Sequence, residues 1–252
     1  MMLEETVSFT NARGGTLKGV LHHASSGTTR GAVLLCHGME SNKESEKLVH
    51  VGRSLAQRNI PSLRFDFSFV GESSGTFEDI TYSGEVEDLS AAFSYLTGRY
   101  PGKIGILGSS MGGTVALLFA AQQTAIAAIA TVAAPIHPEN FPTRLLTPAE
   151  VGQWRKQGFI FYHGQRLNVT LLDDLEKINV PAAAKEISCP VLILHGDGDE
   201  MVPVDEAREI YAYLRSVKKL VILKGADHRL SDPDLMSSAV TQVIEWFCHY
   251  VR

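Results

Sequence analysis

The sequence has few cysteines, no basic tract and no clear membrane-spanning run, and each shortage excludes a class of protein. Its three cysteines are too few and too scattered for a disulfide framework or a zinc site. Lysine and arginine number 23 against 28 aspartates and glutamates, a net charge of −5, so a nucleic-acid-binding surface is not expected. The chain has no dinucleotide fingerprint, no phosphate loop and no metal-ligand histidine spacing, so no cofactor or metal is predicted.

Residues 111–136 carry no charge and are the one stretch long enough to suggest a membrane span. Three polar residues in its middle instead favour a buried helix over 111–122 followed by a buried strand over 125–133. The N-terminus has no basic region followed by an apolar run, so we expect no signal peptide. The cytoplasm is the predicted location.

Hydrophobic residues make up 44% of the chain, enough for a full core, and they fall in a repeating pattern. Further short apolar runs predict inner strands over 31–36, 61–67, 103–107, 190–194 and 219–223. Helical spacing between and after these runs covers 43–58, 84–99, 204–214 and 235–250. Residues 7–22 predict an antiparallel pair that turns at Asn11–Gly15. The alternation predicts an α/β fold with about eight strands, mostly parallel, and helices on both faces.

Residues 135–186 break this alternation. The segment holds five of the ten prolines and is too long for an ordinary connection between a strand and a helix. We therefore expect a cap or lid insertion over 135–186, with the core formed by 1–134 and 187–252.

A candidate nucleophile follows the strand over 103–107. Ser110 stands in Gly108-Ser-Ser-Met-Gly112, a Gly-x-Ser-x-Gly pattern at a strand-to-helix turn, where flanking glycines leave room for a strained, exposed serine. The same pattern occurs around Ser73, but there it lies in a polar loop with no buried helix after it. The context favours Ser110.

A nucleophilic serine needs a base, and the base needs an orienting carboxylate. In this type of fold the chain order is serine, acid, histidine. His228 follows the last predicted strand and is the best candidate base. Three acids follow the preceding strand, and the spacing alone leaves Asp197, Asp199 and Glu200 open.

The loop after residue 36 has the position of an oxyanion-binding loop. A tetrahedral intermediate needs two N–H donors, one from the residue after the nucleophile, Met111, and one from this loop. Met39 is the favoured second donor and Gly38 the alternative. His37 is interpreted as a residue that fixes the loop.

Together these motifs resemble the α/β-hydrolase superfamily over nearly the whole chain, most closely the small bacterial cinnamoyl/feruloyl esterase-like group. That group overlaps with serine aminopeptidase-like and monoacylglycerol-lipase-like proteins. The segments that carry the resemblance are His37-Gly38, Arg64–Phe67, Gly108–Gly113, His195–Pro203 and Gly225–His228. The resemblance implies the α/β-hydrolase fold, the acid at Asp199, the base at His228 and the oxyanion donors at Met39 and Met111.

One loop departs from these relatives, because bulky Phe69 stands where they usually carry glycine. It borders the cleft in the relatives, so Phe69 is a candidate substrate contact. In the insertion, Trp154, Phe161 and Tyr162 are candidates to line an apolar pocket, or else to pack the cap onto the core. The acids at 173–174 are candidates to receive a substrate amine, or else form a solvated helix face or cap.

We therefore predict a serine hydrolase that cleaves small uncharged acyl or aryl carboxylic esters through Ser110, His228 and Asp199 and an acyl-enzyme. A thioesterase or aminopeptidase with the same triad is the nearest alternative, and a non-catalytic ligand-binding member is a further one. The expected partner is a small-molecule ester. The sequence leaves the assembly open, with a homodimer as one option.

Overall fold

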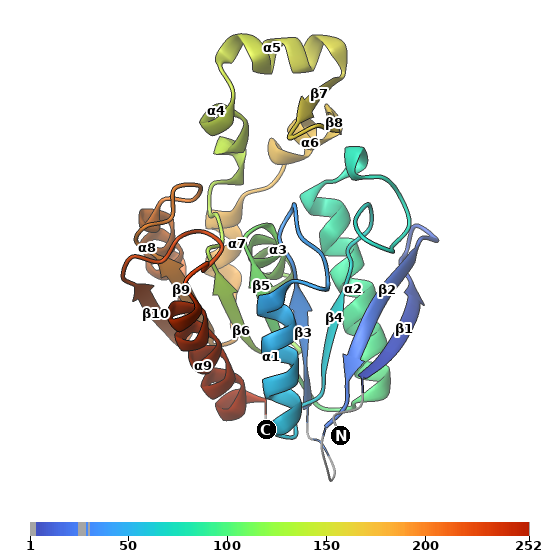
Figure 1. Ribbon diagram of the computed structural model, residues 1–252, viewed down its shortest axis with the longest axis vertical. Helices are drawn as coiled ribbons and strands as arrows, with labels where there is room; N and C mark the ends of the chain where they lie inside the picture. The colour runs from blue at the N-terminus through green and yellow to red at the C-terminus, as the bar shows by residue number, and fades with distance from the viewer. Residues whose placement is uncertain (1–3, 25–28, 30, 252) are drawn as a thin grey trace.

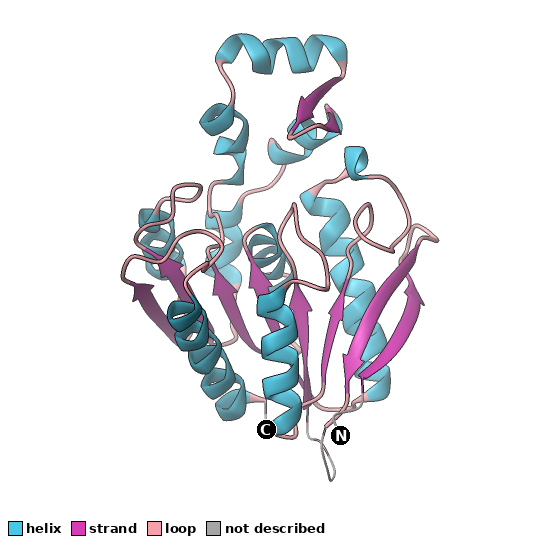
Figure 2. Ribbon diagram, in the orientation of Figure 1, coloured by secondary structure: helices cyan, strands magenta, loops and turns pink. Residues whose placement is uncertain are grey.

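The computed structural model describes residues 4–24, 29 and 31–251, and in it one twisted sheet stands between two layers of helices (Figures 1 and 2). Residues 1–3, on which the expected lack of a signal peptide partly rests, lie outside the described residues. No helix in the described part of the chain has the length and apolar character to cross a membrane.

The main sheet has eight strands in the order β1-β2-β4-β3-β5-β6-β9-β10. β1 pairs with β2 and β2 with β4 in antiparallel fashion, and every other pair is parallel. The predicted architecture is therefore confirmed. The strands are β1 (Glu4–Thr10), β2 (Thr16–His22), β3 (Gly31–Cys36), β4 (Ser62–Phe65), β5 (Lys103–Ser109), β6 (Ile126–Val132), β9 (Val191–Gly196) and β10 (Lys218–Leu223).

Helices cover both faces of this sheet. In Figure 1, α1 (Glu46–Gln57) and α9 (Pro233–Tyr250) lie in front of it. The opposite face is covered by α2 (Tyr82–Arg99), α3 (Met111–Ala120), α7 (Val180–Glu186) and α8 (Val204–Tyr213). The apolar core is accordingly split into two clusters, one on each side of the sheet.

The sequence of β3 explains this division. All six of its residues are buried, and side chains along a strand point alternately to opposite faces. Leu34 and Cys36 join the cluster beneath α2 and α3, whereas Val33 and Leu35 join the one beneath α1 and α9. A continuous apolar run thus supplies both faces at once.

The segment between β6 and α7 stands over the carboxyl ends of the strands (Figure 1). It contains η2 (Pro138–Asn140), α4 (Phe141–Leu145), α5 (Pro148–Gln157), β7 (Phe159–Tyr162), β8 (Gln165–Asn168) and α6 (Thr170–Leu175). α5 is closed by a Thr147–Glu150 capping box at its start and by Gly158, with a φ of 82°, at its end.

The β7–β8 hairpin is an element that the sequence analysis did not predict. Its two-residue turn is His163-Gly164, with φ values of 47° and 79°, and two positive φ values favour a tight hairpin. The turn lies against the loop after β3, because His163 Nδ1 is 2.7 Å from Glu40 Oε1. The base of the hairpin is tied to η1 (Phe77–Asp79) by a 2.7 Å hydrogen bond from Asn168 to Asp79.

Candidate active site

The turn between β5 and α3 holds Ser110 in a strained backbone conformation. β5 ends at Ser109 and α3 begins at Met111, so Ser110 alone joins them. Its φ of 52° and ψ of −124° lie where residues with a Cβ are rarely found. The Ser110 N–H donates to the Val132 carbonyl at 2.8 Å, which ties the turn to β6. Strain of this kind persists only where the surroundings hold it in place.

Two glycines allow the surrounding backbone to approach this turn. A Cβ at Gly108 would lie 2.2 Å from the Gly112 carbonyl oxygen. A Cβ at Gly112 would lie 2.3 Å from the His37 carbonyl oxygen. Any larger residue would therefore push apart β5, α3 and the loop after β3. The spacing of the motif follows from these contacts.

His228 lies between Ser110 and Asp199. Its Nε2 is 3.1 Å from Ser110 Oγ, and its Nδ1 is 2.8 Å from Asp199 Oδ2. A carboxylate only accepts hydrogen bonds, so Nδ1 carries the proton and Nε2 is free to accept the serine hydroxyl proton. The neighbouring Asp227 accepts from the Ser231 N–H at 2.7 Å and so holds its own loop.

Among the three acids left open by spacing, the structure brings only Asp199 to His228. Its other oxygen, Oδ1, accepts from the N–H groups of Met201 and Val202 at 2.9 and 2.8 Å. Burial alone would raise the pKa of Asp199, but hydrogen bonds from His195, His228 and Val202 outweigh it and hold that pKa well below its usual range. Asp197 instead accepts from the Gly225 N–H.

His195 is a second imidazole at this carboxylate, and sequence reasoning gave it no role. It is 1% exposed, and its Nε2 lies 3.2 Å from Asp199 Oδ2 and 2.9 Å from the Val202 carbonyl. Its Nδ1 is buried without a hydrogen-bond partner among the described residues. The N–H of His195 therefore helps to orient Asp199 toward His228.

The loop after β3 is fixed by His37, as expected. His37 Nε2 accepts from the Phe67 N–H at 3.1 Å, so Nδ1 carries the proton that it donates to the Gly38 carbonyl at 2.8 Å. Burial lowers the pKa of His37, which favours this neutral form. In the trans peptide between Gly38 and Met39, the Met39 N–H points opposite to that carbonyl.

The loop also lies directly against the nucleophile. A Cβ on Gly38 would be 3.1 Å from Ser110 Cβ, so the residue before Met39 contacts the serine. Met111 is the first residue of α3, where an N–H has no partner within the helix. Both predicted oxyanion donors thus belong to backbone that adjoins Ser110, and both residues line the cleft described below.

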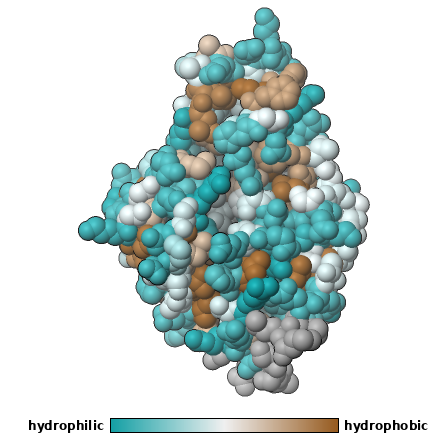
Figure 3. Space-filling model, in the orientation of Figure 1, coloured by the Kyte–Doolittle hydropathy of each residue, from teal (hydrophilic) through white to brown (hydrophobic). Residues whose placement is uncertain are grey.

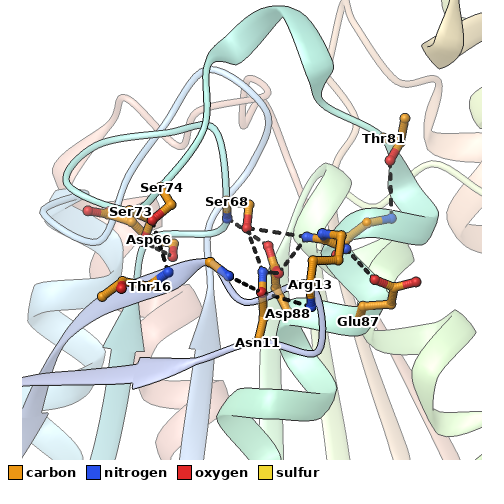
Figure 4. Close-up of polar contacts among 12 residues, drawn as sticks. Asn11, Arg13, Thr16, Asp66, Ser68, Ser73, Ser74, Thr81, Glu87 and Asp88 are labelled. Carbon is orange, nitrogen blue, oxygen red and sulfur yellow. Dashed lines mark hydrogen bonds and ion pairs between the residues drawn. The ribbon is translucent and has the colours of Figure 1, made fainter.

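Ser73, in the competing pentad, has a different role. It is 9% exposed, and its hydroxyl donates to the Asp66 carbonyl at 2.7 Å and accepts from the Lys18 N–H at 3.0 Å. Figure 4 shows Ser73 with Asp66 and, as a separate group of contacts, Ser68 with Asn11 and Asp88. These contacts shape the loop between β4 and α2.

A cleft of about 820 Å³ runs past Ser110 and His228. One end lies beneath the insertion and is lined by Tyr82, Pro138, Phe141, Leu145 and Tyr162. The other end lies at the start of α1 and before α9, and it is lined by Ser41, Ser45, Lys47, Ser109, Leu230 and Ser231. The first end is mainly apolar but includes Arg144, and the second combines polar side chains with Leu48, Leu230 and Met236.

Of the four predicted substrate contacts, Tyr162 lines the cleft and the other three do not. Trp154 is 1% exposed and packs in the core, whereas Phe161 is 67% exposed. Phe161 belongs to β7, over which Figure 3 shows apolar side chains at the surface of the insertion. Tyr162 alone therefore remains a candidate of this group.

Phe69 has a φ of 76°, which explains why glycine suits this position, and its ring lies 5.7 Å from the Arg13 guanidinium carbon. A Cβ on Gly75 would be 2.4 Å from that ring, so the ring packs within its own loop. The acids at 173–174 also lie outside the cleft lining, and Asp174 accepts from the Ser83 N–H at 3.1 Å.

Solved structures share this fold. The chain superimposes with a TM-score of 0.87 on Est1E from Butyrivibrio proteoclasticus with ferulic acid bound, at 23% identity, covering 97% of this chain and 99% of that one. An esterase domain from Rhodothermus marinus gives a TM-score of 0.78 at 25% identity over the full length of both chains. The mouse mitochondrial palmitoyl-protein thioesterase ABHD10 is 27% identical over 220 residues, 82% of this chain and 71% of that protein.

The sheet, the strand-to-helix turn at Ser110 and these likenesses define a hydrolase of the α/β-hydrolase type. Residues 27–158, just over half of the chain, match the family model described as serine aminopeptidase, S33. The chain belongs to this family.

Proposed function

We propose that the protein hydrolyses carboxylic esters through a catalytic triad of Ser110, His228 and Asp199. The observation that carries the proposal is the position of His228, with one ring nitrogen 3.1 Å from Ser110 Oγ and the other 2.8 Å from Asp199 Oδ2. This is the geometry that proton transfer from serine to imidazole requires.

In the first half of the reaction, Ser110 Oγ attacks the ester carbonyl carbon while His228 Nε2 takes the hydroxyl proton. The carbonyl oxygen becomes an oxyanion, which accepts hydrogen bonds from the N–H groups of Met39 and Met111. The bond from carbon to the alcohol oxygen then breaks, and His228 gives its proton to that oxygen. Asp199 stabilises the imidazolium in between.

In the second half, His228 takes a proton from water as the water oxygen attacks the acyl-enzyme. The bond to Ser110 Oγ breaks, the proton returns to the serine, and the carboxylic acid leaves. The acyl group belongs at the apolar end of the cleft, beside Tyr162 and Phe141, which suits small acyl or aryl groups. In this proposal residues 135–186 act as the cap over that end.

The experiment replaces the nucleophile. Ser110→Ala should lower turnover of p-nitrophenyl acetate by about 10⁵-fold or more, because the attacking oxygen is lost. Ser73→Ala is the matched control from the competing pentad and should keep most of the activity. Retention of activity in Ser110→Ala, or failure of Ser110 to react with a fluorophosphonate probe in the folded protein, would overturn the proposal. The second result would favour a non-catalytic ligand-binding protein.

Thioester hydrolysis by the same residues is the second candidate, and the likeness to a palmitoyl-protein thioesterase favours it. Rates on a butyryl ester, a butyryl thioester and an aminoacyl anilide, measured side by side, rank ester, thioester and peptide cleavage. A higher kcat/KM on the thioester, corrected for its intrinsic reactivity, would displace the ester proposal. Location in the cytoplasm stays a prediction.

A further inference from the structure

The polar end of the cleft contains a buried cation that the proposed reaction does not use. Lys47 is 8% exposed, lines the cleft, and donates from Nζ to Ser109 Oγ at 3.0 Å. No carboxylate within the described residues forms an ion pair with it. In the part of the chain that the structure describes, its one hydrogen-bond partner is the neutral hydroxyl of Ser109, the residue before the nucleophile.

We propose that Lys47 binds an anionic group, a carboxylate, on the alcohol part of the ester substrate. The inference rests on the proposed function and names its substrate class: an ester with an apolar acyl group and a leaving group that carries a negative charge. It differs from the small uncharged ester predicted from the sequence, and the charge that it uses belongs to α1 rather than to the insertion.

The position of His228 assigns the two ends of the cleft. The alcohol oxygen must lie near His228, because this residue protonates it. Residues 229–231, which follow His228 in the chain, line the cleft together with Lys47 and Ser45. The leaving alcohol therefore extends toward Lys47, while the acyl group extends beneath the insertion.

The start of α1 provides further donors at this end. Ser45 is the N-cap residue of α1, but its side chain makes no capping hydrogen bond, so its hydroxyl is not engaged with the helix backbone. The first N–H groups of the 12-residue helix have no partner within the helix. The helix dipole and the Lys47 ammonium thus favour an anion at the same place.

Both acidic and basic groups surround Lys47, so we expect this end of the cleft to bind an anion at Lys47 rather than to attract anions in general. Burial lowers the pKa of Lys47 to about 8, and the smaller opposing effect of Asp199 and Asp227 does not cancel it. At neutral pH the ammonium form prevails and gains from a carboxylate partner. Besides Lys47, the titratable groups that line the cleft or the adjoining groove between α1 and α9 are His37, Glu40, Glu46, His50, Tyr82, Arg144, Tyr162, Glu200, His228 and Arg229.

Two matched esters test the proposal: 3-carboxyphenyl butyrate and 3-carbamoylphenyl butyrate, which differ in charge but little in size. The wild-type protein should prefer the carboxylate by kcat/KM. Lys47→Met should lower kcat/KM on the carboxylate ester about tenfold to a hundredfold and change the amide ester less than about threefold. Lys156→Met, at an exposed position of α5, is the control for general charge effects and should leave the preference unchanged.

A second measurement needs no variant. The preference of the wild-type protein for the carboxylate ester should fall as pH rises above about 8, since Lys47 then loses its charge. Equal effects of Lys47→Met on both esters, or a preference that is absent or independent of pH, would overturn the subsite and leave Lys47 as a structural partner of Ser109. Loss of both activities in Ser110→Ala tests the triad separately.

Discussion

Two buried lysines near the start of α1 stand four residues apart and have opposite environments. Lys43 is 5% exposed, and its Nζ donates to Asp66 Oδ2 at 2.7 Å and to Glu72. Burial alone would lower the pKa of Lys43, but these two carboxylates outweigh it and raise that pKa. Lys47 has only a hydroxyl partner among the described residues, and burial lowers its pKa to about 8.

The difference separates a structural cation from a functional one. The Lys43 ammonium neutralises Asp66, which is 0% exposed and also accepts the Lys43 N–H at 2.7 Å and the Glu72 N–H at 2.9 Å. This cluster holds the loop after β4 against the start of α1. Lys47 forms no ion pair among the described residues, and buried groups held at such an energetic disadvantage are concentrated at functional sites.

The largest expected effect on stability comes from replacing Lys43, the lysine that is paired with carboxylates. Lys43→Met should lower the free energy of unfolding by about 3–5 kcal/mol, because it leaves the buried Asp66 carboxylate without its cation. Urea denaturation followed by circular dichroism measures this change, with Lys156→Met as the exposed control. A loss below about 1 kcal/mol would show that water or another donor compensates Asp66.

Replacing Lys47, which has no carboxylate partner among the described residues, should change the free energy of unfolding in the opposite direction. Lys47→Met should raise the free energy of unfolding at pH 7 by about 1–4 kcal/mol, because an uncompensated buried charge is replaced by a thioether of similar length. The folded-state pKa of Lys47 lies below its ordinary 10.5, so the gain is full below about pH 8 and declines as pH rises toward 10.5. Denaturation at pH 7 and pH 10 checks both. A destabilised variant would place Lys47 with Lys43 as a structural residue.

Glu85, a buried acid, extends the comparison of the two lysines, and its replacement should change the free energy of unfolding by a smaller amount. Glu85 is 0% exposed, neither carboxylate oxygen has a partner among the described residues, and burial, aided by Asp88, raises its pKa well above 4.5. The unfolded chain releases this proton near pH 4.5, so the folded state loses stability as pH rises from there. Glu85→Leu should therefore be more stable by up to about 2 kcal/mol at pH 8, with little gain at pH 4. An equal effect at both values would contradict the raised pKa.

Much of the fold could be predicted because each inner strand is recognisable in the sequence as a short apolar run. The all-buried run in β3 and the order of loops after β5, β9 and β10 are properties of the sequence alone. Boundaries were less certain: the helix expected from residue 43 begins at Glu46. The β7–β8 hairpin was missed, although its His163-Gly164 turn between apolar and polar runs is a usable signal.

The site divides in the same way. Ser110 and His228 follow strands, so topology predicts their approach. Side chains in the cleft wall depend on packing that no local pattern encodes. Trp154 faces the core and Tyr162 the cleft. Likewise, the helical position of Lys47 does not predict its hydrogen bond to Ser109, which lies 62 residues away in the chain.

The insertion leaves the sheet after β6 and its chain returns into β9, and these two strands are direct neighbours in the sheet. The insertion therefore begins and ends at two neighbouring strands of the sheet. Evolution or design can lengthen, shorten or exchange this segment without changing the register of any strand pair. In the proposed function, the chemistry at Ser110 and the choice of acyl group can accordingly diverge independently of each other.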